Sequence, residues 1–451
     1  MNSQERVIEL LITGYSHDGK GVGRYAGKPV FVAGALRGEL VRVEFGRERK
    51  GIINGQLLEI IEAAPERVTP VCSVFSSCGG CQLQHLDYQA QLQMKREIVS
   101  NALQRIGGFK DIDVHLTLGM AEPWAYRNKG HFRVSKAEGN ISLGFYEEAS
   151  HKQVQESCRH LFSQAVVELL DSLPDLLEQH QVPIASDVDA GIRHIMVRES
   201  SSRGEILMVL ILSEPLNYDF SAIAREICKN NPRVVGVCTN INPRKAGPIL
   251  GRDIEIVYGK GELLDTIGPY TFRISPHSFF QVNNHQTEVL YSKALEYAAL
   301  KGEELVVDAY CGIGTISLYL ANQSKKVIGV EVVAEAIQDA EENARLNKVS
   351  NVEFIQGEAE KVLPELVEKG LQPQVVVVDP PRKGCGQPLL DSILQVKPER
   401  LVYVSCNPAT LARDLKHLAT GGYQVQEVQP VDMFPQTGHV ECVVLMSRVK
   451  E

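Results

Sequence analysis

The sequence predicts a multidomain chain with a β-barrel at its N-terminus, a central α+β region and a C-terminal α/β domain built on a parallel sheet. Short alternating apolar runs separated by glycine-rich turns fill roughly the first sixty residues. Three cysteines follow within ten positions, from 72 to 81. The last third alternates strand patterns with helix patterns, as parallel sheets do. We place the predicted domains at residues 1–62, 63–275 and 276–451.

The composition is that of an ordinary globular protein. Of the 451 residues, 44% are hydrophobic and 23% are charged. No apolar run is long enough to cross a membrane, and the first ten residues lack the pattern of a signal peptide. We therefore expect a cytoplasmic protein whose ten cysteines are not paired in disulfides. The net charge of −9 does not exclude nucleic acid, because binding depends on where positive charge is concentrated.

The N-terminal runs predict a compact five-stranded barrel of the kind that binds oligonucleotides. Seven basic residues outnumber three acidic ones between positions 24 and 50. This local positive charge predicts contact with RNA, and the alternative is a solvated barrel face. The runs lie at residues 7–12, 28–33, 40–45 and 52–60. The basic residues are Arg24, Lys28, Arg37, Arg42, Arg47, Arg49 and Lys50.

A cysteine-rich segment follows the barrel. Cys72, Cys78 and Cys81 can converge on one metal centre, because two glycines between the last two let the backbone wrap tightly. The best candidate for a fourth ligand is Cys158, which lies in a polar segment. Four thiolates suit both zinc and a [4Fe–4S] cluster, so the spacing leaves this choice open. The C-x3-C-x2-C spacing of radical enzymes is absent, which favours a structural or RNA-positioning role.

The central region contains a predicted helix over residues 88–106 and a predicted strand over residues 126–134. Basic side chains alternate along this strand, and aromatic residues lie nearby. Such a face can contact phosphates and stacked bases together, and the alternative is a solvated strand face. The basic residues are Arg127, Lys129, His131 and Arg133.

A ligand site of the Rossmann-like type is predicted in the last third. A strand runs into a turn with Gly312 and Gly314, then into a helix, and the next strand ends at Glu331. Glycine lets the backbone approach a ligand closely, and the carboxylate can accept two ribose hydroxyls. Dinucleotides and S-adenosylmethionine (SAM) both bind such sites. The third glycine of the dinucleotide fingerprint is missing, which favours SAM.

Two further strands end in residues that carry chemistry. The strand at 374–378 runs into Asp379, which two prolines and Arg382 follow. The strand at 401–404 ends by presenting Cys406 at its carboxyl edge, where open α/β sheets bind their ligands. A cysteine in that position is a candidate nucleophile. Its alternative role is that of a small buried hydrophobe.

Five motifs, in this order, resemble the RNA 5-methyluridine (uracil-5-) methyltransferases. They are FFQVN at 279–283, DAYCGIGT at 308–315, DPPRKG at 379–384, SCNP at 405–408 and HVE at 439–441. The resemblance implies a class I methyltransferase domain and an OB-like TRAM barrel at the N-terminus. It is closest to the 23S rRNA branch, in which the four cysteines would hold a [4Fe–4S] cluster, with zinc as the alternative.

The resemblance also implies roles for single residues. Cys406 would attack C6 of uracil, and Glu441 would later remove the proton from C5. The glycines of the turn aside, the implied SAM contacts are Gln281, Tyr310, Glu331, Glu358 and Asp379. Glu358 stands where the family more often has aspartate or asparagine.

The expected function is methyl transfer from SAM to C5 of one or more uridines in 23S rRNA by a monomer that binds neither DNA nor membranes. The target base has to be flipped out of its stack to reach Cys406. A tRNA (uracil-5-) methyltransferase, a cytosine-5 or amino RNA methyltransferase, and a non-catalytic RNA-binding assembly factor are the alternatives.

Overall fold

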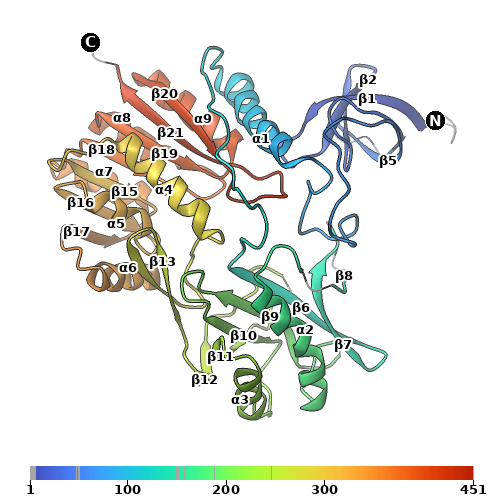
Figure 1. Ribbon diagram of the computed structural model, residues 1–451. Coiled ribbons are helices and arrows are strands. Elements are labelled where there is room, and N and C mark those ends of the chain that lie inside the picture. The colour runs from blue at the N-terminus through green and yellow to red at the C-terminus, as the bar shows by residue number, and fades with distance from the viewer. Residues whose placement is uncertain are drawn as a thin grey trace. The chain divides into compact units, whose positions relative to one another are not determined.

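A computed structural model describes residues 7–46, 48, 51–148, 150, 152–156, 158–186, 188–244 and 246–449. The chain divides into two compact units. Figure 1 labels the helices and strands that they contain. The first unit joins Met1–Ser76, Gly80–Pro123 and Val377–Glu451, and the second joins Ser77–Gly79 and Trp124–Val376. The division falls within strand β18 (Val375–Val378). Within the described residues, no helix combines the length and apolarity that a membrane crossing requires.

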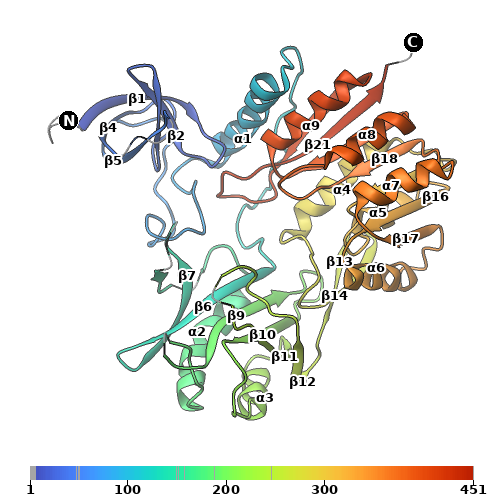
Figure 2. The same ribbon diagram turned by 180° about the vertical axis from the view of Figure 1, so that it is seen from behind.

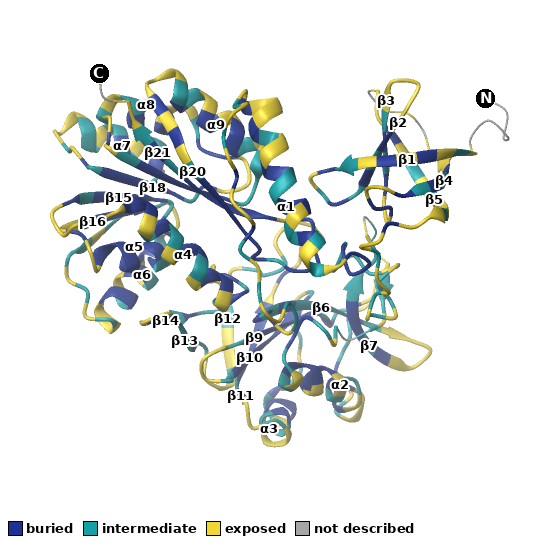
Figure 3. Ribbon diagram, turned by 45° about the horizontal axis from the view of Figure 1, so that its top comes forward, coloured by how far each residue is buried: buried dark blue, intermediate teal, exposed yellow. Residues whose placement is uncertain are grey.

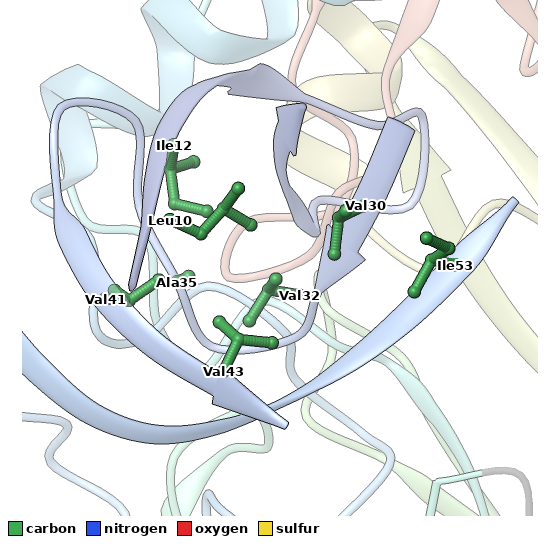
Figure 4. Packing of buried hydrophobic residues seen from close by; sticks show 8 residues of the cluster. All are labelled: Leu10, Ile12, Val30, Val32, Ala35, Val41, Val43 and Ile53. Carbon is green, nitrogen blue, oxygen red and sulfur yellow. The ribbon is translucent and has the colours of Figure 1, made fainter. Parts of the chain in front are cut away.

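The N-terminal part of the first unit is a closed barrel with strand order β1-β2-β3-β5-β4. Its strands are β1 (Val7–Tyr15), β2 (Gly21–Tyr25), β3 (Lys28–Val32), β4 (Leu40–Phe45) and β5 (Ile53–Glu62). Alternate residues point inward and form one apolar core (Figure 4). Gly55 is required in β5, because a Cβ there would lie 2.3 Å from Val43 Cγ1. The predicted barrel is confirmed.

The positive charge predicted for the barrel is largely paired with carboxylates. Lys28 contacts Glu48, and Arg42 contacts Glu59 and Glu9. Arg37 forms an ion pair with Glu97 of helix α1 (Tyr88–Ala102). Exposed pairs of this kind are weak, so these cations can exchange partners with a polyanion. Arg47, Arg49 and Lys50 lie outside the described residues.

The first unit also contains three antiparallel strands in the order β19-β21-β20. They are β19 (Arg400–Ser405), β20 (Tyr423–Val431) and β21 (Glu441–Arg448). The accompanying helices are α1, the π-helical turn η2 (Leu103–Gly107), α8 (Gln387–Val396) and α9 (Pro408–Thr420). Although α1 directly follows the cysteine-rich segment in the sequence, it packs against α9 and β20 at the other end of the chain (Figure 2).

The second unit contains a seven-stranded sheet with the order β12-β11-β10-β9-β6-β7-β8. The strands are β6 (Lys129–Ala137), β7 (Asn140–Tyr146), β8 (Gln153–Val154), β9 (Ile192–Glu199), β10 (Ile206–Leu212), β11 (Val234–Ile241) and β12 (Ile254–Gly259). Helices α2 (Gln164–Gln179) and α3 (Ser221–Asn230) pack against it. The predicted α+β character of the central region is thereby confirmed.

The rest of the second unit is a hairpin followed by alternating strands and helices. The hairpin is β13 (Leu263–Ile267) and β14 (Tyr270–Ile274), and α4 (Asn284–Ala298) follows. The parallel strands are β15 (Leu305–Ala309), β16 (Lys326–Glu331) and β17 (Val352–Gln356). The helices between and after them are α5 (Thr315–Ala321), α6 (Ala334–Leu346) and α7 (Ala359–Glu368). Buried valines and isoleucines fill β15 and β16, while the helices expose their polar faces (Figure 3).

Candidate active site

Cys406 lies between a buried strand and a capped helix. It directly follows β19, and Asn407 caps α9 because its side-chain oxygen accepts a hydrogen bond from the Ala409 amide at 3.1 Å. The Asn407 side chain also donates to the carbonyl of Arg382 at 2.9 Å. Cys406 is half-buried, which is unlike a cysteine packed in a core.

The loop after β18 is held against α9 by one buried carboxylate. Asp414 accepts hydrogen bonds from the Cys385 amide at 2.9 Å and from the Tyr403 hydroxyl at 2.7 Å. Gly384 has a φ of +79°, and a Cβ there would lie 2.5 Å from the same carboxylate. This packing fixes the loop that carries Asp379 and Arg382.

The strand register brings Cys406 and Glu441 to the same end of the sheet. In the antiparallel ladder of β19 and β21, Ser405 pairs with Cys442. The next residue along β19 is Cys406, and the next residue back along β21 is Glu441, so the two stand opposite each other where the ladder ends. Glu441 is 5% exposed. A thiol and a buried carboxyl therefore share one site.

The site holds protons more tightly than isolated side chains do. Burial, followed by the negative charges of Glu441 and Asp379, raises the pKa of Cys406 to about 11, and Arg382 opposes this rise. Burial, followed by Asp379, raises the pKa of Glu441 to about 8. Burial raises the pKa of Asp379 to about 6. At pH 7 the resting site therefore has a thiol and a largely protonated Glu441.

His439 is exposed and contacts Arg382. An Arg382 amino nitrogen lies 3.0 Å from Nδ1 of the His439 ring. As part of the HVE motif, His439 could either orient Glu441 or be a solvated side chain. Its exposure supports the second role.

In the second unit, the glycine-rich turn has the predicted strand, turn and helix. Tyr310, Gly312 and Gly314 all have positive φ, at +68°, +55° and +83°. Gly312 donates its amide to Glu331 at 3.2 Å, and the other Glu331 oxygen accepts from Val333 at 2.9 Å. A Cβ added to Gly312 would have no atom of the described residues within 4 Å beyond its chain neighbours, so that side of the turn is open.

Other predicted SAM contacts lie in the same unit. Gln281 is 9% exposed, and its carbonyl accepts a hydrogen bond from the Asn128 side chain at 2.9 Å. Glu358 is exposed and forms an ion pair with Lys361 at 2.9 Å. Tyr310 donates its hydroxyl to Glu360 at 2.7 Å. Glu360 was missed by sequence reasoning, although it lies in the same acidic stretch as Glu358.

A family model described as tRNA (Uracil-5-)-methyltransferase matches residues 87–449, which is most of the chain. A TRAM domain model matches residues 4–57. The chain belongs to the tRNA (uracil-5-)-methyltransferase family. The resemblance inferred from the five motifs and the barrel is thus confirmed at the level of the family.

Relatives of this methyltransferase match it over nearly their whole length. It is 46% identical over 447 residues to an uncharacterized RNA methyltransferase of Bacillus cereus, covering 98% of this chain and 97% of the relative. It is 45% identical over 440 residues to one of Clostridium tetani, covering 97% and 95%. Among solved structures, the tRNA (uracil-54, C5)-methyltransferase of Pyrococcus abyssi, in complex with S-adenosyl-L-homocysteine, aligns with a TM-score of 0.79 and 28% identity. That alignment covers 97% of this chain and 100% of the other.

The four cysteines of the methyltransferase are of intermediate burial. Cys72 and Cys81 belong to the first unit, and Cys78 and Cys158 belong to the second. Cys78 forms a β-bridge with Glu147, and the Gly79 amide donates to Tyr146 at 3.0 Å, which anchors this segment on β7. Across the described part of the chain, no group of three or more potential ligands is arranged as a metal site.

The basic strand of the methyltransferase alternates as predicted. Lys129, His131 and Arg133 share one face of β6, while Gly130 and Phe132 on the other face are buried. In the register with β9, Lys129 stands opposite Arg198, which places two like charges side by side. Burial, followed by Arg198 and Arg127, lowers the pKa of Lys129 to about 7. This face is therefore more enclosed than a solvated strand face.

Proposed function

We propose that the protein transfers a methyl group from SAM to C5 of a uridine in 23S rRNA through a covalent adduct between Cys406 and C6. The main support is the register of β19 and β21, which brings the half-buried Cys406 thiol and the buried Glu441 carboxyl to the same end of one ladder. Family membership supports the reaction class, and the Bacillus cereus relative is described as an RNA methyltransferase.

The first chemical role is that of Cys406. C5 of uracil is too weak a nucleophile to accept a methyl group unaided, so a thiolate has to add to C6 and make C5 enolate-like. The resting thiol has a raised pKa, and Arg382 is the cation that favours its ionised form. The Sγ proton passes to solvent as the Sγ–C6 bond forms. C5 is then the nucleophile toward the methyl group that bound SAM would supply, with S-adenosyl-L-homocysteine as the leaving group.

The second role is that of Glu441. After methylation, C5 carries both the methyl group and a proton. The Glu441 carboxylate removes that proton, the C5–C6 double bond re-forms, and Cys406 leaves C6 as a thiolate. A pKa near 8 suits this task, because a base works best when its pKa lies near the working pH.

The open glycine turn fits SAM. SAM supplies an electrophilic methyl group when bound. The residues proposed to hold it are Gln281, Tyr310, Gly312, Gly314, Glu331, Glu358 and Asp379. The S-adenosyl-L-homocysteine in the Pyrococcus abyssi structure supports this assignment.

We also propose the domains 1–62, 63–275 and 276–451, with RNA held by the first two.

The substrate is tested by mapping 5-methyluridine in cells that lack the gene. The 23S rRNA assignment rests on the resemblance carried by the barrel and the four cysteines. A tRNA substrate is the second candidate, because the Pyrococcus abyssi enzyme acts on tRNA. We expect 5-methyluridine to disappear from 23S rRNA and to persist in tRNA. Loss from tRNA alone would support the second candidate, and loss from neither would reject both.

Catalysis itself is tested with RNA in which 5-fluorouridine replaces uridine. Fluorine cannot be removed as a proton, so the adduct on Cys406 should persist and shift the protein on a denaturing gel. Protein that binds this RNA and SAM without forming the adduct would be a binding factor rather than an enzyme.

We propose that Cys72, Cys78, Cys81 and Cys158 hold a [4Fe–4S] cluster, with zinc as the alternative. Cysteine thiolates are the ligands that either centre requires. Cys78→Ser is expected to remove iron and visible absorbance from anaerobically purified protein. Cys228→Ser on α3 is the control and should retain both. Zinc in place of iron in the wild-type protein would contradict the cluster.

Lys129 is expected to contact RNA phosphate. Lys129→Ala should weaken RNA binding about tenfold and lower the salt dependence of the affinity by about one released counterion. Lys136→Ala is a matched control, because Lys136 lies on the same strand and is exposed at its end. Filter binding at several salt concentrations measures both values. Equal effects of the two variants would contradict a specific contact by Lys129.

A further inference from the structure

Residues 432–440, which we call the hairpin connection, join β20 to β21 and lead directly into Glu441. Asp432, Gln436 and Thr437 in it are almost fully buried, although a hairpin connection normally faces solvent. Hydrogen bonds join it to α1 and to the segment just before this helix. A helix remote in sequence therefore contacts the connection that leads to Glu441.

The first attachment is a buried ion pair. Lys95 of α1 and Asp432 both have fully buried side chains, and Lys95 Nζ lies 2.5 Å from Asp432 Oδ1. Lys95 also donates to the carbonyl of Phe434 at 3.1 Å. Tyr88 of α1 donates its hydroxyl to the other Asp432 oxygen at 3.0 Å. One end of the hairpin connection is thus fixed by three hydrogen bonds.

The second attachment is centred on Gln436, whose φ of +68° is unfavourable for a residue with a side chain. Gln91 of α1 donates to the Gln436 side chain at 3.0 Å and accepts from the Gln436 amide at 3.1 Å. The amides of Gln82 and Leu83 both donate to the Gln436 carbonyl, at 2.9 and 3.0 Å. These contacts hold Gln436 in a backbone conformation that residues with a side chain rarely adopt.

The hydrogen bonds continue from these attachments toward Glu441. Thr437 donates its hydroxyl to the Phe434 carbonyl at 2.8 Å and accepts from the His439 amide at 3.3 Å. Only Val440 separates His439 from Glu441. A buried ion pair is weak evidence for stability, because apolar residues of similar volume often stabilise a protein as well or better. Its better attested use is to fix one arrangement of the chain.

We propose that Lys95 and Gln91 are positioning residues that act through the hairpin connection to hold the Glu441 carboxyl buried beside Cys406. The inference rests on the proposed role of Glu441 as the base. It assigns α1, which lies outside the methyltransferase sheet, a part in the step that resolves the covalent adduct. Adduct formation by Cys406, which lies after β19, depends on a different strand.

The test separates these two steps in single-turnover experiments with RNA and SAM. Gln91→Asn shortens the side chain so that it no longer reaches Gln436. We expect adduct formation to change less than about threefold and adduct resolution to slow on the order of tenfold to a hundredfold, as small misplacements of catalytic groups do. Lys95→Met should slow resolution at least as much. Gln93→Asn, an exposed position two residues along α1, is the matched control.

The midpoint of the pH dependence of adduct resolution would not change if Lys95 and Gln91 only stabilised the fold. In the wild-type protein, resolution should rise with pH to a midpoint near the Glu441 pKa of about 8. In Gln91→Asn, water should reach the loosened carboxyl, so this midpoint should move to lower pH.

Two outcomes would overturn the proposal. One is an equal loss of formation and resolution in Gln91→Asn, which would indicate general destabilisation. The other is an unchanged rate of adduct resolution in Gln91→Asn, with an unchanged midpoint of its pH dependence. Because Gln91→Asn alone can give either outcome, the test does not require Lys95→Met to fold. Failure of Glu441 as the base is distinguished separately, because Glu441→Gln itself would then resolve its adduct normally.

Discussion

Cys406→Ala is expected to abolish methylation, lowering turnover by on the order of 10⁴ or more, as removal of a nucleophile does. Without the thiolate, no covalent bond forms at C6, and C5 does not become nucleophilic. SAM binding should be unchanged, because the residues proposed to hold SAM, Asp379 apart, lie on β15, β16 and their neighbours in the second unit. Transfer of labelled methyl groups to RNA measures turnover, and calorimetry measures SAM binding.

The control for this prediction is a second cysteine of the same unit. Cys385 is buried just after the Asp379 loop, and Cys385→Ser should retain most of the turnover. Substantial methylation by Cys406→Ala would contradict the covalent mechanism. A loss of SAM binding in that variant would mean that Cys406 supports the fold rather than the chemistry.

Glu441→Gln is expected to accumulate the covalent adduct on ordinary RNA, because the proton on C5 is no longer removed. The product-release step should slow on the order of 10² to 10⁴-fold, the range that general bases contribute. Mass spectrometry of the trapped species should find protein, RNA and one added methyl group. Normal turnover, or a complete absence of adduct, would contradict the assignment of Glu441.

The same variant has an expected effect on stability. Burial raises the pKa of Glu441 to about 8, so the folded protein keeps a proton that the unfolded chain releases near its ordinary value of 4.5. Stability therefore falls as the pH rises from the unfolded pKa toward the folded pKa. The amide of the variant carries no titrating proton, and Glu441→Gln should gain in melting temperature over the wild type between pH 5 and pH 8. An advantage that does not grow with pH would contradict a buried, neutral Glu441.

Local patterns in the sequence were sufficient to predict the barrel, the glycine turn and the strand that ends at Cys406. Strands β1 to β5 were predicted from their alternating apolar residues, and the parallel strands were predicted from their valine-rich runs. Glu331 was predicted for the same reason, because it directly ends β16. Each of these features depends on residues that are neighbours along the chain.

Contacts between distant segments could not be predicted in this way. The sequence did not predict that the Tyr310 hydroxyl donates to Glu360, which lies in the first turn of α7. The low pKa of Lys129 arises from its burial and from Arg198, which the register of β6 and β9 places opposite it. Lys95 looked like an ordinary helix residue, and nothing in its surroundings along the chain points to Asp432.

Lys95 and Asp432 are far apart along the chain, so the ribosome makes one long before the other. These partners are 337 residues apart, so α1 leaves the ribosome long before the residue that neutralises Lys95 has been made. At about 5–20 residues per second, this interval lasts on the order of twenty seconds to a minute. During that time the barrel can fold, since its strands precede α1 in the chain. The surface of α1 that later contacts the hairpin connection has no partner until residues 432–440 have been made. A nascent chain therefore cannot form this buried pair, or bring Glu441 beside Cys406, until the segment that contains Asp432 and Glu441 has been made.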